Sequence, residues 1–319
     1  MNVLITGAAG YLGQQLTHYL LQETTHTVIA ADIRDESPFQ PHEQLHYVKL
    51  DVRSNEATAL FQAHAVDVVV HLASIVTPGK KSNRAFEYSV DVLGTENILQ
   101  ACVEANVRRI IVSSSGAAYG YYADNPEWLT ETDTIRGNEA FAYSHHKRLV
   151  EELLATYRDK HPQLEQTIFR IGTILGENVR NQITNLFEQK YLVGIRGSDS
   201  PFVFIWDQDV VRCFAAAIDS DKTGIYNVAG DGALTVDELG ILLNKRVIKI
   251  PAPAVSQGLF VLKRLQLTQY GEEQVDFLRY RPVLSNDKLK NDFGYIPQKT
   301  SLEVFEHYMW SRMKEKQIV

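Results

Sequence analysis

Tyr143 and Lys147 stand four residues apart in a stretch with a helical pattern. On an α-helix this spacing places both side chains on one face, about 6 Å apart along the axis. A nearby ammonium stabilises a phenolate, so Tyr143 could act as a general base near neutral pH. The spacing alone is a weak indication, because Tyr295 and Lys299 repeat it across Pro297, which breaks any helix.

Three consecutive serines, Ser113 to Ser115, close a short apolar run that reads as a strand, and the segment carrying Tyr143 follows it. Ligand crevices in open α/β sheets lie at the carboxyl ends of the strands, which is what singles out Tyr143. The alternative is that the serines are turn and cap residues, and this interpretation is favoured for Ser113 and Ser114.

A second group of residues could bind a dinucleotide. Gly7, Gly10 and Gly13 follow the first apolar run, at a spacing that lets the backbone approach a pyrophosphate at a helix N-terminus. Asp32 lies about 20 residues further on, where a carboxylate accepts hydrogen bonds from the adenosine ribose and repels a 2′-phosphate. NAD is therefore favoured over NADP, although Arg34 could pair with a 2′-phosphate.

The composition limits the classes of partner. The chain has 319 residues, 45% of them hydrophobic, and a formal net charge of −7, so a full core is expected and nucleic-acid binding is not. Cys102 and Cys213 lie in apolar helical contexts without metal-ligand spacing, so we expect reduced core residues and no metal site. With no signal-peptide pattern and no membrane-length apolar run, we expect a cytoplasmic enzyme without a membrane partner.

Short apolar runs alternate with helical patterns over the first 175 residues, which predicts a doubly wound α/β fold with a parallel sheet. The predicted strands are Val3–Thr6, Thr27–Ala31, Tyr47–Leu50, Val66–His71, Arg109–Ser113 and Gln166–Arg170. The predicted helices are Tyr11–Gln22, Glu56–Ala63, Arg84–Ala105 and Tyr143–Lys160.

The pattern loosens after Gly176, so residues 1–175 are predicted to form the Rossmann-type domain and 176–319 a smaller α/β substrate-binding region. Some elements of this region are expected to return to the sheet. Predicted helices are Ile183–Lys190, Asp209–Ala217, Thr235–Asn244 with Thr235 as its cap and Glu238 closing a capping box, and a terminal helix from Leu302; Gly224–Val228 is a predicted strand and Pro251–Pro253 a Pro-punctuated segment.

Taken together, these motifs resemble the extended short-chain dehydrogenase/reductases, also called the NAD-dependent epimerase/dehydratase family. The resemblance runs nearly from end to end. It is carried by the glycine pattern, His71-Leu72-Ala73-Ser74, Val92-Leu93-Gly94-Thr95-Glu96-Asn97, Ser113 to Gly120, Tyr143-x-x-x-Lys147, Phe204 to Val210, Tyr226-Asn227-Val228 and Phe293 to Pro297. These motifs are specific for the family and say little about the substrate.

The resemblance implies NAD as cofactor and a set of site residues. The implied catalytic residues are Ser115, whose hydroxyl would hydrogen-bond the reacting substrate oxygen, Tyr143 and Lys147, with Ser114 as the alternative hydroxyl. The implied cofactor-binding residues are Gly7, Gly10, Tyr11, Leu12, Gly13, Asp32, Asp51, Val52, Leu72, Ala73, Ser74, Ser113, Tyr143 and Lys147. Besides Ser115, the candidate substrate-binding residues are Phe202, Arg279 and Arg281.

The chain departs from the family pattern at several positions. Dehydratases of the family carry an acid one or two residues after the catalytic hydroxyl, where this chain has Gly116 and Ala117, which argues against a 4,6-dehydratase. Asp91 stands where the family usually has Asn. Phe202 stands where nucleotide-sugar enzymes often place an Arg that holds the diphosphate, so Arg279 or Arg281 would have to supply that charge, unless both are surface residues.

Three functions fit this sequence. The first is an epimerase that acts on a nucleotide-sugar by transient oxidation of a hydroxyl, with Tyr143 as base and NAD retained throughout. The second is an NAD(P)-dependent dehydrogenase or reductase of a small or hydrophobic alcohol or carbonyl, for which Phe202, Trp206 and Gly258–Leu267 would line the pocket. A dinucleotide-binding regulator with a dead active site is least favoured, because the catalytic residues are present.

The resemblance also implies a homodimer joined through the helices predicted at Arg84–Ala105 and Tyr143–Lys160. Both helices carry apolar residues on more than one side, so a second face must be buried by something. The first stripes are Phe86, Val90, Leu93, Asn97 and Ala101, and Leu149, Leu153 and Tyr157; Val92, Ile98, Leu99, Val103, Val150 and Leu154 fall outside them. A two-fold partner, or the C-terminal region of the same chain, could cover that face.

Overall fold

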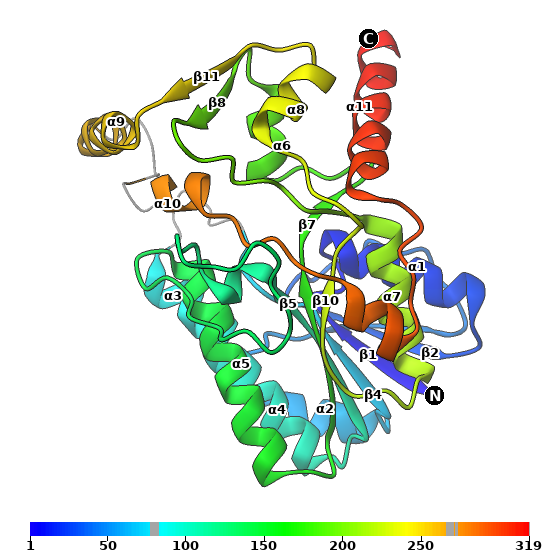
Figure 1. The fold of residues 1–319 in the computed structure, drawn as a ribbon. Helices are drawn as coiled ribbons and strands as arrows, with labels where there is room; N and C mark the ends of the chain where they lie inside the picture. Colours follow the sequence, from blue (N-terminus) through cyan, green and yellow to red (C-terminus); the bar gives the residue numbers. More distant parts are fainter. Residues whose placement is uncertain (77–82, 266–270, 272–273, 319) are drawn as a thin grey trace. The chain divides into compact units, whose positions relative to one another are not determined.

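The computed structural model describes residues 1–76, 83–265, 271 and 274–318, and its central feature is a seven-stranded sheet (Figure 1). The strand order is β10-β6-β5-β4-β1-β2-β3. These strands are β1 (Asn2–Thr6), β2 (Thr27–Asp32), β3 (Leu45–Lys49), β4 (Val68–His71), β5 (Arg109–Ser115), β6 (Glu165–Ile171) and β10 (Gly224–Val228). The neighbouring pairs from β3 to β5 run parallel, and the predicted doubly wound α/β fold is confirmed.

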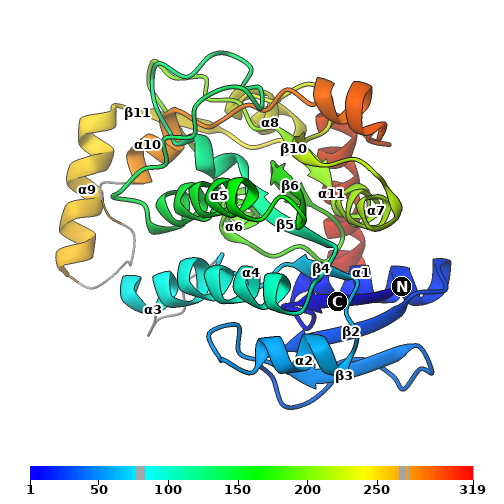
Figure 2. The same ribbon diagram turned by 90° about the horizontal axis from the view of Figure 1, so that it is seen from below.

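Helices cover both faces of this sheet, as Figure 2 shows. One face carries α2 (Ala57–Ala63), α4 (Gly94–Glu104) and α5 (Ala142–Lys160), and the other carries α1 (Tyr11–Glu23) and α7 (Asp207–Asp219). The strands are apolar on both sides because both sides are covered: Val68 to Val70 and Ile110 to Val112 are all buried.

Packing divides the chain into two compact units. The first unit contains Met1–Ser115, His146–Arg170 and Gln208–Tyr226, and the second contains Gly116–His145, Ile171–Asp207 and the chain from Asn227 onward. The second unit therefore takes two stretches, 116–145 and 171–175, from the first 175 residues. The first unit takes α7 from Gln208 onward and most of β10 from the later part. The assignment of residues 176–319 to substrate binding concerns function, and it stays a prediction.

The second unit has its own small sheets and helices. Its two parallel pairs are β7 (Thr173–Leu175) with β9 (Phe204–Trp206), and β8 (Leu192–Ile195) with β11 (Val247–Ile250). Its helices are α6 (Gln182–Glu188), α8 (Val236–Leu242), α9 (Ala252–Arg264), α10 (Gln274–Arg279) and α11 (Ser301–Ile318). The Thr235–Glu238 capping box is confirmed at the start of α8. Among the described helices, none has both the length and the hydrophobicity needed to cross a membrane.

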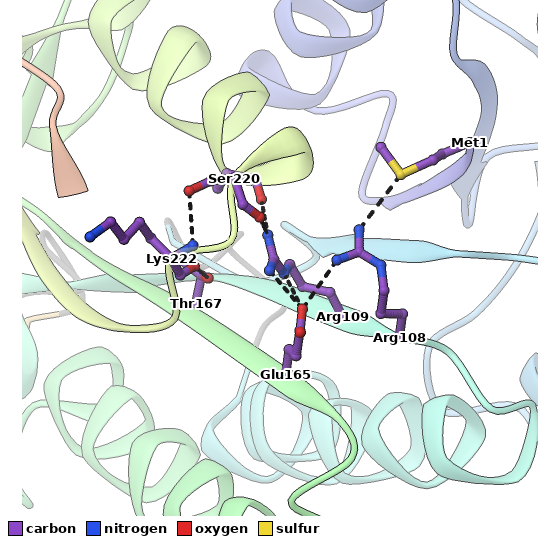
Figure 3. A network of polar contacts seen from close by, with 8 residues as sticks. Met1, Arg108, Arg109, Glu165, Thr167, Ser220 and Lys222 are labelled. Atoms are coloured by element: carbon purple, nitrogen blue, oxygen red, sulfur yellow. Dashed lines mark hydrogen bonds and ion pairs between the residues drawn. The ribbon is translucent and has the colours of Figure 1, made fainter.

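A buried arginine ties the end of α7 to the sheet (Figure 3). Arg109 is fully buried, donates to the backbone oxygens of Ala217 and Ser220, and pairs with Glu165 at 2.6 Å. A cation at a helix C-terminus satisfies carbonyl groups that have no partner within the helix. This network fixes α7 against β5 and β6 inside the first unit, and it lies at the amino ends of these strands, away from the serines that end β5.

Two predicted elements differ from the structure. The helix predicted over 84–105 is divided into α3 (Arg84–Tyr88), a π-helical turn (Ser89–Leu93) and α4. Asp91, within this turn, accepts from the backbone N of Ile75, a contact distant in sequence that a helical pattern does not specify. The Pro251–Pro253 segment begins α9, since proline is tolerated in the first helical turn, where its missing N–H has no partner to lose. Residues 266–267 of the apolar stretch predicted as a pocket wall lie outside the described residues.

The structure also shows what covers the apolar faces of α4 and α5. Leu99 and Leu154, expected to belong to a face needing a partner, are fully buried in the core of the first unit, together with Ile98 and Val150. That expectation was wrong because both helices pack directly onto the sheet with these residues. The exposed apolar side chains are Phe86 at 43%, Tyr88 at 38% and Leu93 at 47%, on α3 and the π-helical turn.

Candidate active site

The glycine loop lies at the topological switch point of the sheet, between β1 and β4. Gly7 directly follows β1 and has a φ of +68°, and a Cβ there would lie 2.9 Å from the backbone N and Cα of Ala73, just beyond β4. The chain leaves β1 toward β2 and β3 on one side and returns to β4, β5 and β6 on the other. The crevice that this order creates is where α/β sheets bind dinucleotides.

The residues here fit the pyrophosphate of NAD. Gly10 is the N-cap of α1, so the first amides of this helix have no partner within it and point out of its N-terminus. A Cβ on Gly13 would lie 2.7 Å from Cα of Ala8, so only glycine lets the helix pack this closely under the loop. Tyr11, at the first helical position, is exposed, and Leu12 is half-buried beside it.

Asp32 ends β2 next to this loop. Its carboxylate accepts from the backbone N of Ala9 at 2.9 Å and from the backbone N of Arg34 at 3.2 Å. Each oxygen keeps lone pairs that could accept ribose hydroxyls. The Arg34 side chain is mostly exposed and donates to the backbone O of Ala9 at 3.2 Å, so it borders the same position.

Asp32→Ala is expected to reduce the preference for NAD over NADP by about tenfold or more, since the anion that repels a 2′-phosphate is removed and Arg34 remains to meet it. Dissociation constants for both cofactors, measured on both proteins, test this. The companion Asp32→Ala/Arg34→Ala protein should bind NADP more weakly than Asp32→Ala does. An unchanged preference in Asp32→Ala would assign cofactor selection to another residue.

The next two predicted cofactor residues follow β3. Asp51 forms a two-point ion pair with Arg53, with distances of 2.9 and 2.6 Å, and this hydrogen bonding holds the pKa of the Asp51 carboxyl below its usual range. Val52 is buried, and its methyl would lie 2.7 Å from a Cβ on Gly94. The ion pair thus holds the Asp51 carboxylate in place, and Val52 packs against α4 at Gly94.

The loop after β4 carries Leu72, Ala73 and Ser74, all half-buried. The backbone N of Leu72 and that of Ala73 donate to the hydroxyl of Thr6, at 3.2 and 3.3 Å. The Ser74 hydroxyl donates to Asp91 at 3.0 Å. The loop is therefore anchored at both ends within the first unit.

His71, the last residue of β4, is buried in a directional chain of hydrogen bonds. Thr95 donates its hydroxyl proton to the backbone O of Asp91 at 2.6 Å, so its oxygen accepts from Nε2 of His71 at 3.0 Å. Nδ1 of His71 then accepts from the hydroxyl of Thr6 at 2.7 Å. Burial, aided by the charge of Lys147, lowers the pKa of His71 to about 3.

The neutral state of His71 makes the protein less stable in acid. The unfolded chain binds a proton on His71 below the ordinary histidine pKa of 6.5, whereas the folded protein does so only near 3. The contribution is complete above pH 6.5 and falls by up to about 1.4 kcal/mol per pH unit as the pH drops toward 3. His71→Gln, which can keep a donor and an acceptor, should show a shallower loss of unfolding free energy between about pH 6 and 4. Equal slopes in denaturant titrations would contradict this.

The catalytic candidates of the first unit gather at the end of β5. Lys147 donates to the backbone O of Ser113 at 2.9 Å, which fixes its ammonium group beside the strand end. Successive side chains of a strand point to opposite faces of the sheet, so Ser114 points away from the face on which Ser113 and Ser115 lie. Its hydroxyl donates to the buried carboxylate of Glu151. This hydrogen bond gives Ser114 a structural role and leaves the half-buried Ser115 as the stronger candidate hydroxyl.

Tyr143 is on α5, the same helix as Lys147, and packing groups it with the second unit. Its ring lies 6.4 Å from that of Phe141, which contacts Tyr121 and Phe277 at 5.6 and 6.0 Å. Burial raises the pKa of the Tyr121 phenol, and the nearby Tyr143 adds to the shift. Tyr143 therefore borders an aromatic cluster that the sequence did not predict.

Arg281 joins this cluster, whereas Arg279 does not. The Arg281 guanidinium stacks on Phe202 at 3.8 Å, lies 5.5 Å from the Phe277 ring and donates to the backbone O of Ser200 at 2.8 Å. Burial lowers the pKa of Arg281 to about 9, so it stays cationic at neutral pH. No described carboxylate pairs with it. Phe202 is itself a core residue, and its ring supports the Arg281 guanidinium. The guanidinium of Arg279 stacks instead on the ring of Tyr280, at 4.5 Å.

Comparison with known families places this chain. The NAD dependent epimerase/dehydratase family matches residues 3–229, well over half of the sequence. The chain therefore belongs to this family, and it is an NAD-dependent enzyme of the extended short-chain dehydrogenase/reductase type. The family and the cofactor predicted from the sequence are confirmed.

Individual relatives are distant. An uncharacterized protein of Mycobacterium tuberculosis is 25% identical over 97% of this chain and 84% of its own length. A UDP-glucose 4-epimerase of Yersinia enterocolitica is 28% identical over 58% of this chain and 60% of its own length. The structure of UDP-glucose 4-epimerase from Thermotoga maritima, with UDP-glucose, superposes with a TM-score of 0.75 at 18% identity over 99% of this chain and 100% of that one. The last likeness supports the fold alone.

The sequence did not predict the partners of Asp91 and Arg281. His146, adjacent to Lys147, pairs with Asp91, and the only available sign of this was a histidine beside a carboxylate at an unusual position. The aromatic residues around Arg281 come from separate segments, Phe202 from just before β9 and Phe277 from α10, and no periodic pattern in the sequence could have linked them.

Proposed function

We propose that this protein is a nucleotide-sugar epimerase that oxidises a sugar hydroxyl transiently, with Tyr143 as general base. The observation that carries the proposal is Arg281, a half-buried cation without a described carboxylate partner, held in the aromatic cluster that Tyr143 borders. A guanidinium that is partly shielded from water and has no carboxylate beside it favours an anionic ligand, and the oxygens of a diphosphate can accept its hydrogen bonds. The relatives named UDP-glucose 4-epimerase agree with it.

In this proposal Tyr143 removes the hydroxyl proton of the sugar while Ser115 donates a hydrogen bond to the same oxygen. Lys147 stabilises the phenolate through its positive charge, which the Ser113 carbonyl helps to position. NAD held by the glycine loop and Asp32 would supply the hydride acceptor and donor for the sugar carbon. Tyr143 then gives its proton back to the oxygen, so the enzyme ends in its starting state.

The surroundings of Gly116 argue against a dehydratase. A Cβ at this buried position would lie 3.1 Å from a methyl group of Leu284. An acidic side chain, which a dehydratase needs here to protonate the leaving group, would have to displace Leu284. The nucleotide-sugar reaction proposed therefore ends at epimerisation.

The second candidate is a dehydrogenase or reductase of a hydrophobic alcohol or carbonyl. The aromatic side chains of Tyr121, Phe141 and Phe277 favour it, because they offer apolar walls beside Tyr143. In that case Arg281 would serve to hold Phe202 and Phe277 in place, and NAD would exchange in each turnover.

Two measurements separate these functions. The protein is purified without added cofactor, denatured and assayed for released NAD; retained NAD is expected for the epimerase. It is then incubated with UDP-glucose and other nucleotide-sugars, with sugar configuration followed by NMR and NADH by absorbance. A new epimer without net NADH supports the proposal, whereas an empty cofactor site and stoichiometric NADH from a simple alcohol would replace it with the second candidate.

We also propose a homodimer whose interface includes the exposed Phe86, Tyr88 and Leu93. These large apolar side chains are exposed within eight residues of one another in the chain, and exposed apolar surface is typical of interaction sites. Light scattering should give about twice 36.1 kDa, and Phe86→Asp/Leu93→Asp should shift the mass to the monomer with little loss of stability. Ile241→Asp, an exposed residue on α8, is the control. A monomeric unmodified protein at micromolar concentration would contradict the dimer.

A further inference from the structure

Asp91 is a buried carboxylate held by three donors. Its Oδ1 accepts from the backbone N of Ile75 at 2.8 Å and from the hydroxyl of Ser74 at 3.0 Å. Its Oδ2 accepts from Nδ1 of His146 at 3.0 Å. The exposed fraction of the side chain is 4% for Asp91 and 1% for His146, so the pair is removed from water.

The donors come from two functional segments. Ser74 and Ile75 belong to the loop after β4, which borders the glycine loop through Ala73. His146 directly precedes Lys147 on α5, and Lys147 is fixed to Ser113. The Asp91–His146 pair therefore connects the cofactor loop to the lysine at the end of β5, entirely within the first unit.

The backbone around Asp91 adds a separate observation. Asp91 lies in the π-helical turn Ser89–Leu93. Such turns are rare in proteins as a whole, and those that occur are often found at functional sites. Its carbonyl accepts from Thr95, which starts the hydrogen-bond chain through His71 to Thr6. Thr6 in turn accepts from the backbone N of Leu72 and that of Ala73, so the backbone of Asp91, like its side chain, is connected to the loop after β4.

We propose that Asp91 and His146 act as one positioning pair. The pair holds the loop 72–75 and the turn of α5 that carries Lys147 in a fixed position relative to each other. The proposal rests on the proposed roles of that loop and of Lys147. A buried charge is costly unless it is fully hydrogen-bonded, and removing one partner exposes that cost. Here all three hydrogen bonds are directed to segments that the reaction uses.

Each variant removes a defined part of the pair. Asp91→Ala loses all three contacts, so NAD affinity should fall by about tenfold or more. Asp91→Asn keeps an oxygen for Ser74 and Ile75 and should bind NAD within about threefold of the unmodified protein. His146→Ala leaves the loop contacts, so NAD affinity should stay within about threefold while kcat falls by about tenfold through misplaced Lys147.

The matched control is Glu151→Gln, because Glu151 forms another buried ion pair on α5, with Arg170 at 2.7 Å, and does not contact the loop. It should lower the melting temperature without changing NAD affinity. In the Asp91→Ala/His146→Ala protein, kcat should be no lower than in the worse single variant, because Asp91→Ala already breaks the contact with His146 that His146→Ala removes.

The experiment combines NAD binding by calorimetry, melting temperature, kcat and the ¹⁵N-histidine NMR spectrum. The spectrum should show a strongly downfield Nδ1 proton for His146, which Asp91→Ala abolishes. NAD affinity of Asp91→Ala within about twofold of the unmodified protein would overturn the proposal. So would an equal NAD loss in Glu151→Gln, or multiplied kcat losses in the double variant. Should Tyr143→Phe stay active, the proposed function fails, but the binding and NMR results still decide the role of the pair.

Discussion

Tyr143→Phe is expected to lower turnover by about 10²–10⁴-fold while NAD affinity stays near that of the unmodified protein. The ring and its contact with Phe141 remain, so the helix and the aromatic cluster should not change. What is lost is the phenol, the group proposed to carry the proton. Lys147 remains beside Ser113 but cannot replace it, because an ammonium ion has no lone pair to accept a proton.

The control for this variant is Tyr157→Phe, further along the same helix, where the half-buried ring packs against the core of the first unit. It should retain close to full activity. Turnover and NAD binding are measured on both proteins. If Tyr143→Phe kept more than about a tenth of the activity, the general base would have to be another residue.

Gly7→Ala is expected to lower NAD affinity by about 100-fold or more and to destabilise the fold by about 3 kcal/mol, for two independent reasons. The φ of +68° is unfavourable for any residue with a Cβ. The added Cβ would also lie 2.9 Å from the backbone of Ala73, which cannot move without displacing the loop after β4. Both effects act at the crevice proposed to hold the pyrophosphate.

Gly197→Ala separates the two effects, since Gly197 has a φ of +77° and nothing within 4 Å of its would-be Cβ. Only the backbone term applies there, so a loss of about 1 kcal/mol and unchanged NAD affinity are expected. Denaturant unfolding and calorimetric NAD titration measure both quantities. Equal behaviour of the two variants would show that the close approach to Ala73 contributes nothing.

Local patterns along the chain were sufficient for the elements and for the cofactor end. Buried strands are apolar without alternation, so their positions followed from the sequence to within a few residues, as in β1 and β2. The Thr235 capping box and the glycine loop before Asp32 depend on groups a few residues apart or on one strand–turn–helix unit. Such short-range interactions are encoded where they occur.

Tertiary structure alone decided which distant residues meet. Leu99 and Leu154 could not be assigned to the sheet or to a partner, because a helix with apolar residues on several sides does not state which side packs inward. The strand order brings Gly7 beside Ala73, a π-helical turn brings Asp91 to His146, and the second unit stacks Arg281 on Phe202. These contacts depend on strand order and side-chain packing between segments far apart in the chain, which no local pattern specifies.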